Sequence, residues 1–133
     1  MSQQGTLEQR RANYAWQKVT EVKGKGFAKK YGQLARSAPA DVQTNGLGQT
    51  LAFWRANGFK AGKAQQNEHA QLLEDVSKWV MERFDWRHEK DLLGWITGAS
   101  ATTDRYRQAT VETLALLVWI KRFAEAELGE DKP

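Results

Sequence analysis

Apolar residues recur at intervals of three and four along most of this chain, and this periodicity limits the possible folds more than any other feature of the sequence. The segment from Glu68 to Phe84 shows it best, with inward-facing positions at Leu72, Leu73, Val76, Trp79, Val80 and Phe84. Such spacing is typical of one face of an α-helix. No segment alternates apolar and polar residues as a half-buried strand does. The 133 residues therefore predict an all-α fold, a single-domain compact bundle of about five to six helices.

Capping signals and breakers place the first three helices. Thr6 with Gln9 resembles a capping box, and the first helix should run from there to a break at Gly24 and Gly26. The second should span residues 27–37 and end before Pro39, which disfavours helical geometry in the residue ahead of it. The third should run from Pro39 through the Asn45-Gly46 pair to about residue 57, closed by Gly58.

The second half of the chain predicts a loop followed by three helices. Residues 58–67 have the composition of a loop without strands. A helix over 68–84 follows, with Glu68, Glu74, Asp75 and Glu82 mostly outward, and then a charged connector over 85–90. Asp91 should cap a short helix that stops near Gly98. Thr102 or Thr103 should start the last helix, which runs to about residue 128. Residues 1–5 and 129–133 should fray.

Tryptophans and one apolar run indicate where the core lies. Four tryptophans sit within apolar patterns and are expected in the core, namely Trp54, Trp79, Trp95 and Trp119. Trp16 and Trp86 are not assigned. The run from Leu114 to Ile120 is apolar on every side of its helix, which predicts either a central core helix or a subunit contact.

Positive charge is concentrated in the first half of the chain. Residues 1–63 carry 11 Lys/Arg against 3 Asp/Glu, whereas residues 64–133 carry 9 against 13. This asymmetry indicates a surface that binds a polyanion on one half and a solvated or partner-facing surface on the other. An uneven but merely solvated surface is the alternative.

The stretch from Lys23 to Trp54 supplies the predicted binding face. On the helix over 27–37, Phe27, Tyr31, Leu34 and Ala38 fall on one side, and Lys29, Gly32 and Arg36 fall on the other. Gly32 leaves room either for a phosphate backbone or for a crossing helix. The predicted phosphate contacts are Lys25, Lys29 and Arg36 in this stretch, with Lys23 and Lys30 as second choices. Lys60 and Lys63, in the predicted loop over 58–67, extend this basic patch and are also predicted phosphate contacts.

A stripe of small residues predicts close packing. Gly48, Ala52 and Ala56 recur at intervals of four on one helix face. They should let another helix or another subunit approach closely.

Residues for catalysis, metal binding or cofactor binding are not evident. The chain has no cysteine, which excludes thiolate metal sites and fits a reducing cytosolic compartment. His69 and His88 lack metal-ligand spacing, and they could meet Glu68, Glu89 and Asp91 only through the fold. The segment from Gly58 to Ala64 lacks the length and the Ser/Thr of a nucleotide-binding loop. With no signal peptide or membrane-spanning run, we expect a soluble, cytoplasmic, non-catalytic protein without cofactors.

Two runs identify a family. The run NGLGQTLAF from Asn45 to Phe53 and the run WIKRFA from Trp119 to Ala124 resemble the small helical subunit of the type III-B CRISPR RNA-silencing complex, the Cmr complex. Further likeness lies in Lys30-Tyr31, Ala35-Arg36, Pro39, Tyr106-Arg107 and Ala109-Thr110. The resemblance extends from about residue 15 to 128, while residues 58–102 match little of the family pattern.

The resemblance implies an all-helical, non-catalytic subunit that stacks in a few copies as the minor filament of the complex. Its partners would be other Cmr subunits, further copies of itself, and the guide and target RNA. The alternative from the residues themselves is a helical interaction module whose basic half binds an acidic protein. A third hypothesis is an enzyme, whose turnover would depend on His88 or Glu89.

Overall fold

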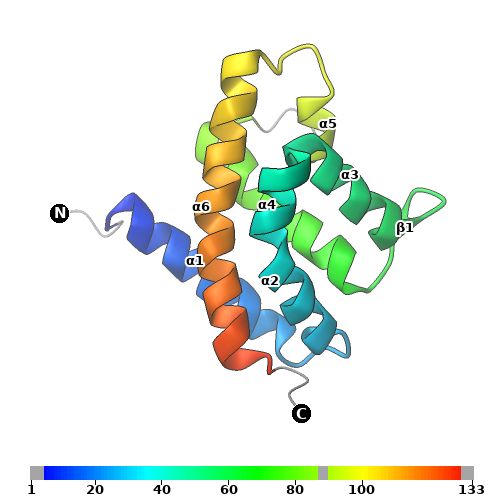
Figure 1. Cartoon of the computed structure of the whole chain (residues 1–133), viewed down its shortest axis with the longest axis vertical. Coiled ribbons are helices and arrows are strands. Elements are labelled where there is room, and N and C mark those ends of the chain that lie inside the picture. The colour runs from blue at the N-terminus through cyan, green and yellow to red at the C-terminus, as the bar shows by residue number, and fades with distance from the viewer. Residues whose placement is uncertain (1–4, 87–89, 130–133) are drawn as a thin grey trace.

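The computed structural model describes residues 5–86 and 90–129, and within these ranges the chain forms six helices and one small hairpin (Figure 1). The elements are α1 (Leu7–Val22), α2 (Ala28–Asn45), α3 (Leu47–Gly58), β1 (Phe59–Lys60), β2 (Lys63–Ala64), α4 (Glu68–Phe84), α5 (Leu92–Ile96) and α6 (Thr103–Glu127). The predicted all-α class is confirmed. The ends expected to fray fall largely on residues 1–4 and 130–133, which lie outside the described residues. No helix within the described ranges is long and apolar enough to cross a membrane.

Side-chain caps begin three of the helices where the sequence predicted. Thr6 Oγ1 accepts the Gln9 N–H at 3.0 Å, and the Thr6 N–H donates to Gln9 Oε1 at 2.7 Å, which completes the capping box of α1. Asp91 caps α5 by accepting the Gly94 N–H at 2.8 Å, and Thr102 caps α6. Because each cap satisfies amides that the first helical turn leaves without partners, the chain fixes these starts locally.

The boundary between α2 and α3 differs from the prediction. The helix does not end before Pro39 but continues to Asn45, and the break falls at Gly46. Buried side chains recur along α2 on both sides of the proline, at Tyr31, Ala35, Ala38 and Val42, so packing offsets the local penalty of the proline. Gly46 has φ +88° and ψ 158°, a conformation that is nearly restricted to glycine.

A two-residue hairpin occupies the segment that the sequence predicted as a loop without strands. Phe59 pairs with Ala64 and Lys60 with Lys63 in antiparallel register. Ala61 and Gly62 both have positive φ, as the turn of a two-residue hairpin loop requires. Two residues per strand are too few to show alternation, so the sequence pattern could not reveal them.

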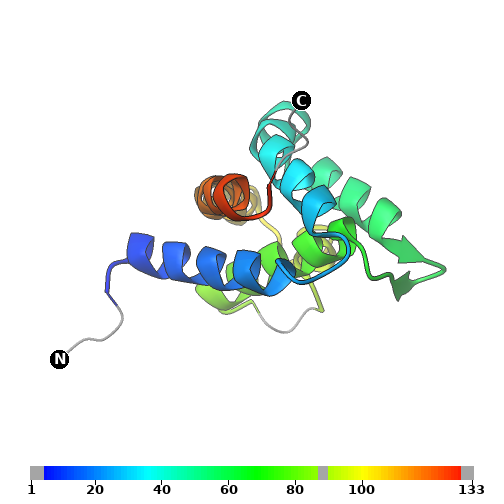
Figure 2. The ribbon, with the colours of Figure 1, turned by 90° about the horizontal axis from the view of Figure 1, so that it is seen from below.

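α6 runs beside both α1 and α2 (Figure 2), and its middle supplies much of the core. Leu116, Leu117 and Ile120 are buried, whereas Val118 is 46% exposed, so the run is core on most of its sides and open on one. Trp54 and Trp95 are buried as predicted. Trp79 and Trp119 are only half-buried, and each donates its indole N–H to a carboxylate, Glu112 and Glu8 respectively.

Asp75 corrects the predicted outward face of α4. It is only 2% exposed because it lies on the same helical stripe as Leu72, Val76 and Trp79. The Tyr31 hydroxyl donates to Asp75 Oδ2 at 2.7 Å, and the Gln71 amide donates to Oδ1 at 3.0 Å. Its place on the helix, and not its charge, decides which way it faces.

Candidate nucleic acid interface

Two of the predicted phosphate contacts share one hollow. Lys25 lies in the turn between α1 and α2, and Lys30 lies in the first turn of α2. Both are exposed, and both line a depression of about 740 Å³ that the segment from Gln66 to Glu68 closes on its other side. Two ammonium groups at one depression make it a favourable place for phosphate. Glu21 and Glu68 also line it, so its charge is mixed.

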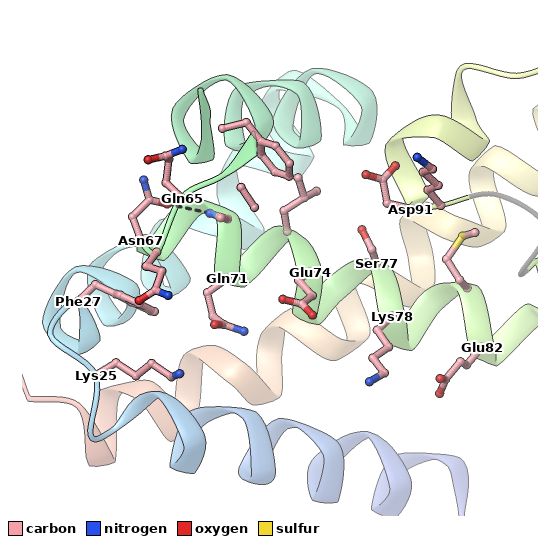
Figure 3. A pocket seen from close by; sticks show the side chains of 17 residues that line it. Lys25, Phe27, Gln65, Asn67, Gln71, Glu74, Ser77, Lys78, Glu82 and Asp91 are labelled. Atoms are coloured by element: carbon pink, nitrogen blue, oxygen red, sulfur yellow. Dashed lines mark hydrogen bonds between the residues drawn. The ribbon is translucent and has the colours of Figure 1, made fainter. Parts of the chain in front are cut away.

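A larger groove continues from Lys25 along α4. This α4 groove has a volume of about 770 Å³ and is lined, among others, by Lys25, Gln65, Asn67, Gln71, Glu74, Ser77 and Lys78. Figure 3 shows Gln71, Glu74, Lys78 and Glu82 on the side of α4 that faces α1, while Ser77 points to the opposite side, toward Asp91. Cations and carboxylates alternate along the groove, so it does not form a continuous track for a phosphate backbone.

Lys60 and Lys63 form a separate pair on the hairpin. They lie opposite each other in the ladder, and both are exposed. Their neighbours Phe59 and Ala64 line the α4 groove. Because successive side chains of a strand point to opposite faces, the two lysines project from the other face of the hairpin.

The predicted basic face of α2 is interrupted at its middle. Gly32 is buried, and a Cβ at this position would lie 3.4 Å from Leu128 Cβ. Gly32 therefore admits the end of α6, which confirms the packing alternative and leaves no opening for a phosphate there. Lys29 is exposed, and Arg36 is half-buried. These two residues flank a closed contact and not an open face.

Lys23 is engaged within the chain. Its ammonium lies 2.8 Å from Glu127 Oε1 at the end of α6. The pair is partly exposed, so it contributes little to stability. It does place a carboxylate beside the lysine, and a phosphate would have to displace that carboxylate.

The stripe of small residues divides into two parts. The Gly48 N–H donates to the Tyr106 hydroxyl at 2.7 Å, and a Cβ at Gly48 would lie 3.3 Å from that oxygen. Gly48 thus allows α6 to approach within the chain. Ala52 and Ala56 are exposed beside Phe53, which is itself 57% exposed. They leave an uncharged face of α3 open, and its role as a subunit contact stays a prediction.

Sequence reasoning missed Ser77 and Lys78. Ser77 is buried, and its Oγ has no hydrogen-bond partner, while Lys78 is an exposed cation between Glu74 and Glu82 on an acidic helix. Helical spacing of Lys78 from Gln71 and Glu74 could have placed it on their face. The groove itself needs the fold, because its walls come from segments far apart in the sequence.

The described residues show no arrangement for metal binding. Residues 5–86 and 90–129 contain no group of three or more His, Cys, Asp or Glu that could hold a metal ion. His69 Nδ1 lies 3.1 Å from Glu68 Oε2, and its ring packs against Phe53 at 5.7 Å. His88 and Glu89, on which the enzyme hypothesis depends, lie outside the described residues.

Comparison with known proteins gives concordant results. The family model described as "CRISPR-associated protein (Cas_Cmr5)" matches residues 7–127, the span from α1 to the end of α6. The chain is 35% identical over 120 residues to "CRISPR system Cmr subunit Cmr5" of Thermus thermophilus, covering 90% of this chain and 93% of that protein. A crystal structure of a CRISPR-associated Cmr5 family protein from the same organism superposes with a TM-score of 0.69 at 28% identity, covering 93% of this chain and 98% of that one.

Proposed function

The chain belongs to the Cmr5 family of CRISPR-associated proteins, and from this premise we propose that it is a non-catalytic structural subunit of a type III-B Cmr effector complex in the cytoplasm. The family match over residues 7–127 is the observation that carries this proposal. It covers every helix of the fold, so the likeness extends over the whole bundle and is not limited to one motif. The partners are then the other Cmr subunits and further copies of this chain.

Contact with RNA runs through phosphate groups at the depression that Lys25 and Lys30 share. Both ammonium groups are exposed and line it together, and cations placed in this way bind phosphate without reading sequence. Lys60 and Lys63 supply a second contact on the hairpin. Lys29 and Arg36 are left with a minor role, because the end of α6 closes the surface between them at Gly32.

Stacking of copies uses the open face of α3. Its exposed residues Ala52, Ala56 and Asn57 carry no charge, and the small side chains of Ala52 and Ala56 let a second backbone come close. A surface that meets a different surface of the next copy produces an open filament when the rotation does not close. This arrangement suits a minor filament.

Charge reversal tests the RNA contact. The double variant Lys25→Glu with Lys30→Glu, in the assembled complex, should weaken target-RNA binding at moderate salt. It should also reduce the slope of log K against log salt by about 1.4, since each lost contact to a single strand removes about 0.7. The measurement is a titration of labelled target RNA at several salt concentrations.

Arg107→Glu with Arg122→Glu is the matched control. Both arginines are exposed on α6, and the pair makes the same change in charge. It should leave affinity and slope unchanged. An unchanged slope in the Lys25/Lys30 variant, or an equal loss in the control, would contradict the assignment of this surface to RNA.

A further inference from the structure

We propose that a second hollow, between α2 and α3, binds one unstacked base of single-stranded RNA through stacking on Phe53, with a preference for guanine. The hollow has a volume of about 550 Å³ and is lined by Asp41, Asn45, Gln49, Thr50 and Phe53; we call it the Phe53 hollow. The inference rests on the proposed function, which places RNA beside this chain. It adds base recognition at a second surface, apart from the lysines that are expected to contact phosphate.

Phe53 provides a stacking surface. Its ring is the most exposed aromatic side chain among the large apolar residues found at the surface, 57% against 42% for Trp16. The His69 ring packs against it at 5.7 Å with an interplanar angle of 76°, which fixes its orientation while leaving most of it open. Single-stranded RNA is bound by this kind of contact, in which an unstacked base lies on an aromatic face.

The polar groups of the Phe53 hollow suit the edge of a base. Asn45 and Gln49 are exposed, and within residues 5–86 and 90–129 neither side-chain amide has a hydrogen-bond partner. Each amide offers a donor and an acceptor. Asp41 adds a carboxylate, of which Oδ2 accepts the Ser37 hydroxyl at 3.1 Å. Its Oδ1 takes no hydrogen bond from the described residues and is available to a ligand.

The charge of the Phe53 hollow selects a base over a phosphate. No cation lines it, and its one charged residue is Asp41, so a phosphate would be repelled. A carboxylate accepts hydrogen bonds and cannot donate them when ionised. Guanine presents donors at N1 and at its N2 amino group on the same edge, so it is the base that Asp41 satisfies best. Adenine and uracil each present a single donor position there.

The turn that precedes α3 holds this arrangement in place. Gly46 ends α2, and the Thr50 hydroxyl donates to the Asp41 carbonyl at 3.1 Å across the turn. This bond ties the last turn of α2, which carries Asp41 and Asn45, to the first turns of α3, which carry Gln49 and Phe53. The Phe53 hollow is therefore formed by rigid helix ends and does not depend on a loop.

The test compares base-bearing and abasic RNA on the full-length chain at low salt. The probes are two uridine nonamers of equal charge, one with a central guanosine and one with a central abasic site, titrated by NMR. We expect the guanosine strand to bind about tenfold more tightly, as stacking of one base predicts. Phe53→Ala should bring the ratio of the two affinities, guanosine strand over abasic strand, to about one without changing the affinity for the abasic strand. Phe53→Tyr should preserve the ratio of the wild type. Trp16→Ala, which removes the next most exposed ring, should leave it unchanged.

Asp41→Asn tests the preference for guanine. It should lower the affinity for the guanosine strand relative to a central-adenosine strand several-fold, because the amide presents one acceptor and one donor where the carboxylate presents two acceptors. Phe53 is at the surface, and Asp41 is only half-buried, so both variants should fold. Thermal unfolding of each variant checks this directly.

Three outcomes would overturn the inference. If the wild-type ratio is one while Lys25→Glu with Lys30→Glu weakens both strands, base recognition fails and the phosphate contact stands. If neither strand binds the wild type, the chain has no base site of its own and the base inference fails, while the phosphate contact is decided separately by the titration of the assembled complex. If Phe53→Ala leaves the ratio intact but weakens assembly with the other subunits, the Phe53 hollow holds a protein side chain.

Discussion

Asp75 connects three helices through hydrogen bonds. It lies on α4, it accepts a hydrogen bond from Tyr31 on α2, and its backbone carbonyl accepts the Tyr14 hydroxyl of α1 at 2.6 Å. Burial raises the pKa of Asp75 to about 6, although the hydrogen bonds from Tyr31 and Gln71 act in the opposite direction. Burial therefore outweighs the hydrogen bonds at this position.

The raised pKa of Asp75 makes stability depend on pH. The folded state holds the proton more tightly than the unfolded chain, whose aspartate has a pKa near 3.9. The protonated Asp75 carboxyl therefore contributes up to about 3 kcal/mol to the free energy of unfolding. This contribution is complete below about pH 4 and is lost as pH rises through about 6. The free energy of unfolding of wild type, minus that of Asp75→Asn, should fall over this range and be flat above it. Urea titrations at pH 4, 5, 6 and 7 measure this, and a difference that does not change with pH would contradict it.

At the scale of elements, the α2–α3 break depends on one glycine. Gly46 has φ +88° and ψ 158°, and a Cβ there would meet nothing nearer than the Tyr106 hydroxyl at 3.9 Å. The penalty of a side chain is thus one of backbone conformation and not of space.

Gly46→Ala should therefore destabilise the protein by about 1–3 kcal/mol, the range for strained backbone conformations. Gly24→Ala is the control, because a Cβ at Gly24 meets nothing within 4 Å and its φ is not positive. It should change stability by less than about 0.5 kcal/mol. Chemical denaturation of both variants measures the difference, and equal effects would argue against a special role of the backbone at Gly46.

Helix starts were predictable from the sequence, and one internal boundary was not. Thr6, Asp91 and Thr102 act on the amides next to them, so their effect can be seen in a few residues of sequence. Pro39 and Gly46 gave opposing signals whose balance depends on what α2 packs against. The outcome was set by the buried face from Tyr31 to Val42, which only the folded chain defines.

At the scale of the whole molecule, the two charge halves of the sequence are not two halves of the structure. α1 and α2 pack against α6, and α3 packs against α4, so basic and acidic segments are interleaved. This explains why the candidate site was only partly predictable. Lys25 and Lys30 lie where the sequence placed a basic surface, but Glu21 and Glu68 line the same depression.

Glu112, in the acidic half of the sequence, forms hydrogen bonds with Arg11 in the basic half. It is 3% exposed, and its carboxylate accepts hydrogen bonds from Arg11 Nε and Nη2 on α1 and from Trp79 Nε1 on α4, each at 2.7 Å. Burial raises the pKa of Glu112, but the hydrogen bonds from Arg11 and Trp79 outweigh it and hold the pKa below its usual value. The carboxylate is therefore charged in the folded protein, and its partners depend on that charge.

Glu112→Ala should destabilise the whole fold by about 3 kcal/mol, because it leaves a guanidinium and an indole N–H without their partner in a partly buried site. Glu125→Ala, an exposed position on the same helix, should have an effect of less than about 0.5 kcal/mol. Thermal and chemical unfolding measure both. A loss confined to α1, seen as early exchange of its amides while α4 and α6 stay protected, would contradict the view that Glu112 joins the three helices.

The contact between α1 and α6 also bears on how the protein is made. α1 is translated before α6, so its Arg11 finds Glu112 only 101 residues later, and its buried residues Ala15, Val19 and Val22 have no cover from α6 until then. At about 5–20 residues per second, the ribosome leaves this apolar stripe uncovered for several seconds. The apolar stripe of α1 thus stays without its partner helix until α6 has been translated, and the bundle closes only after α6 has left the exit tunnel.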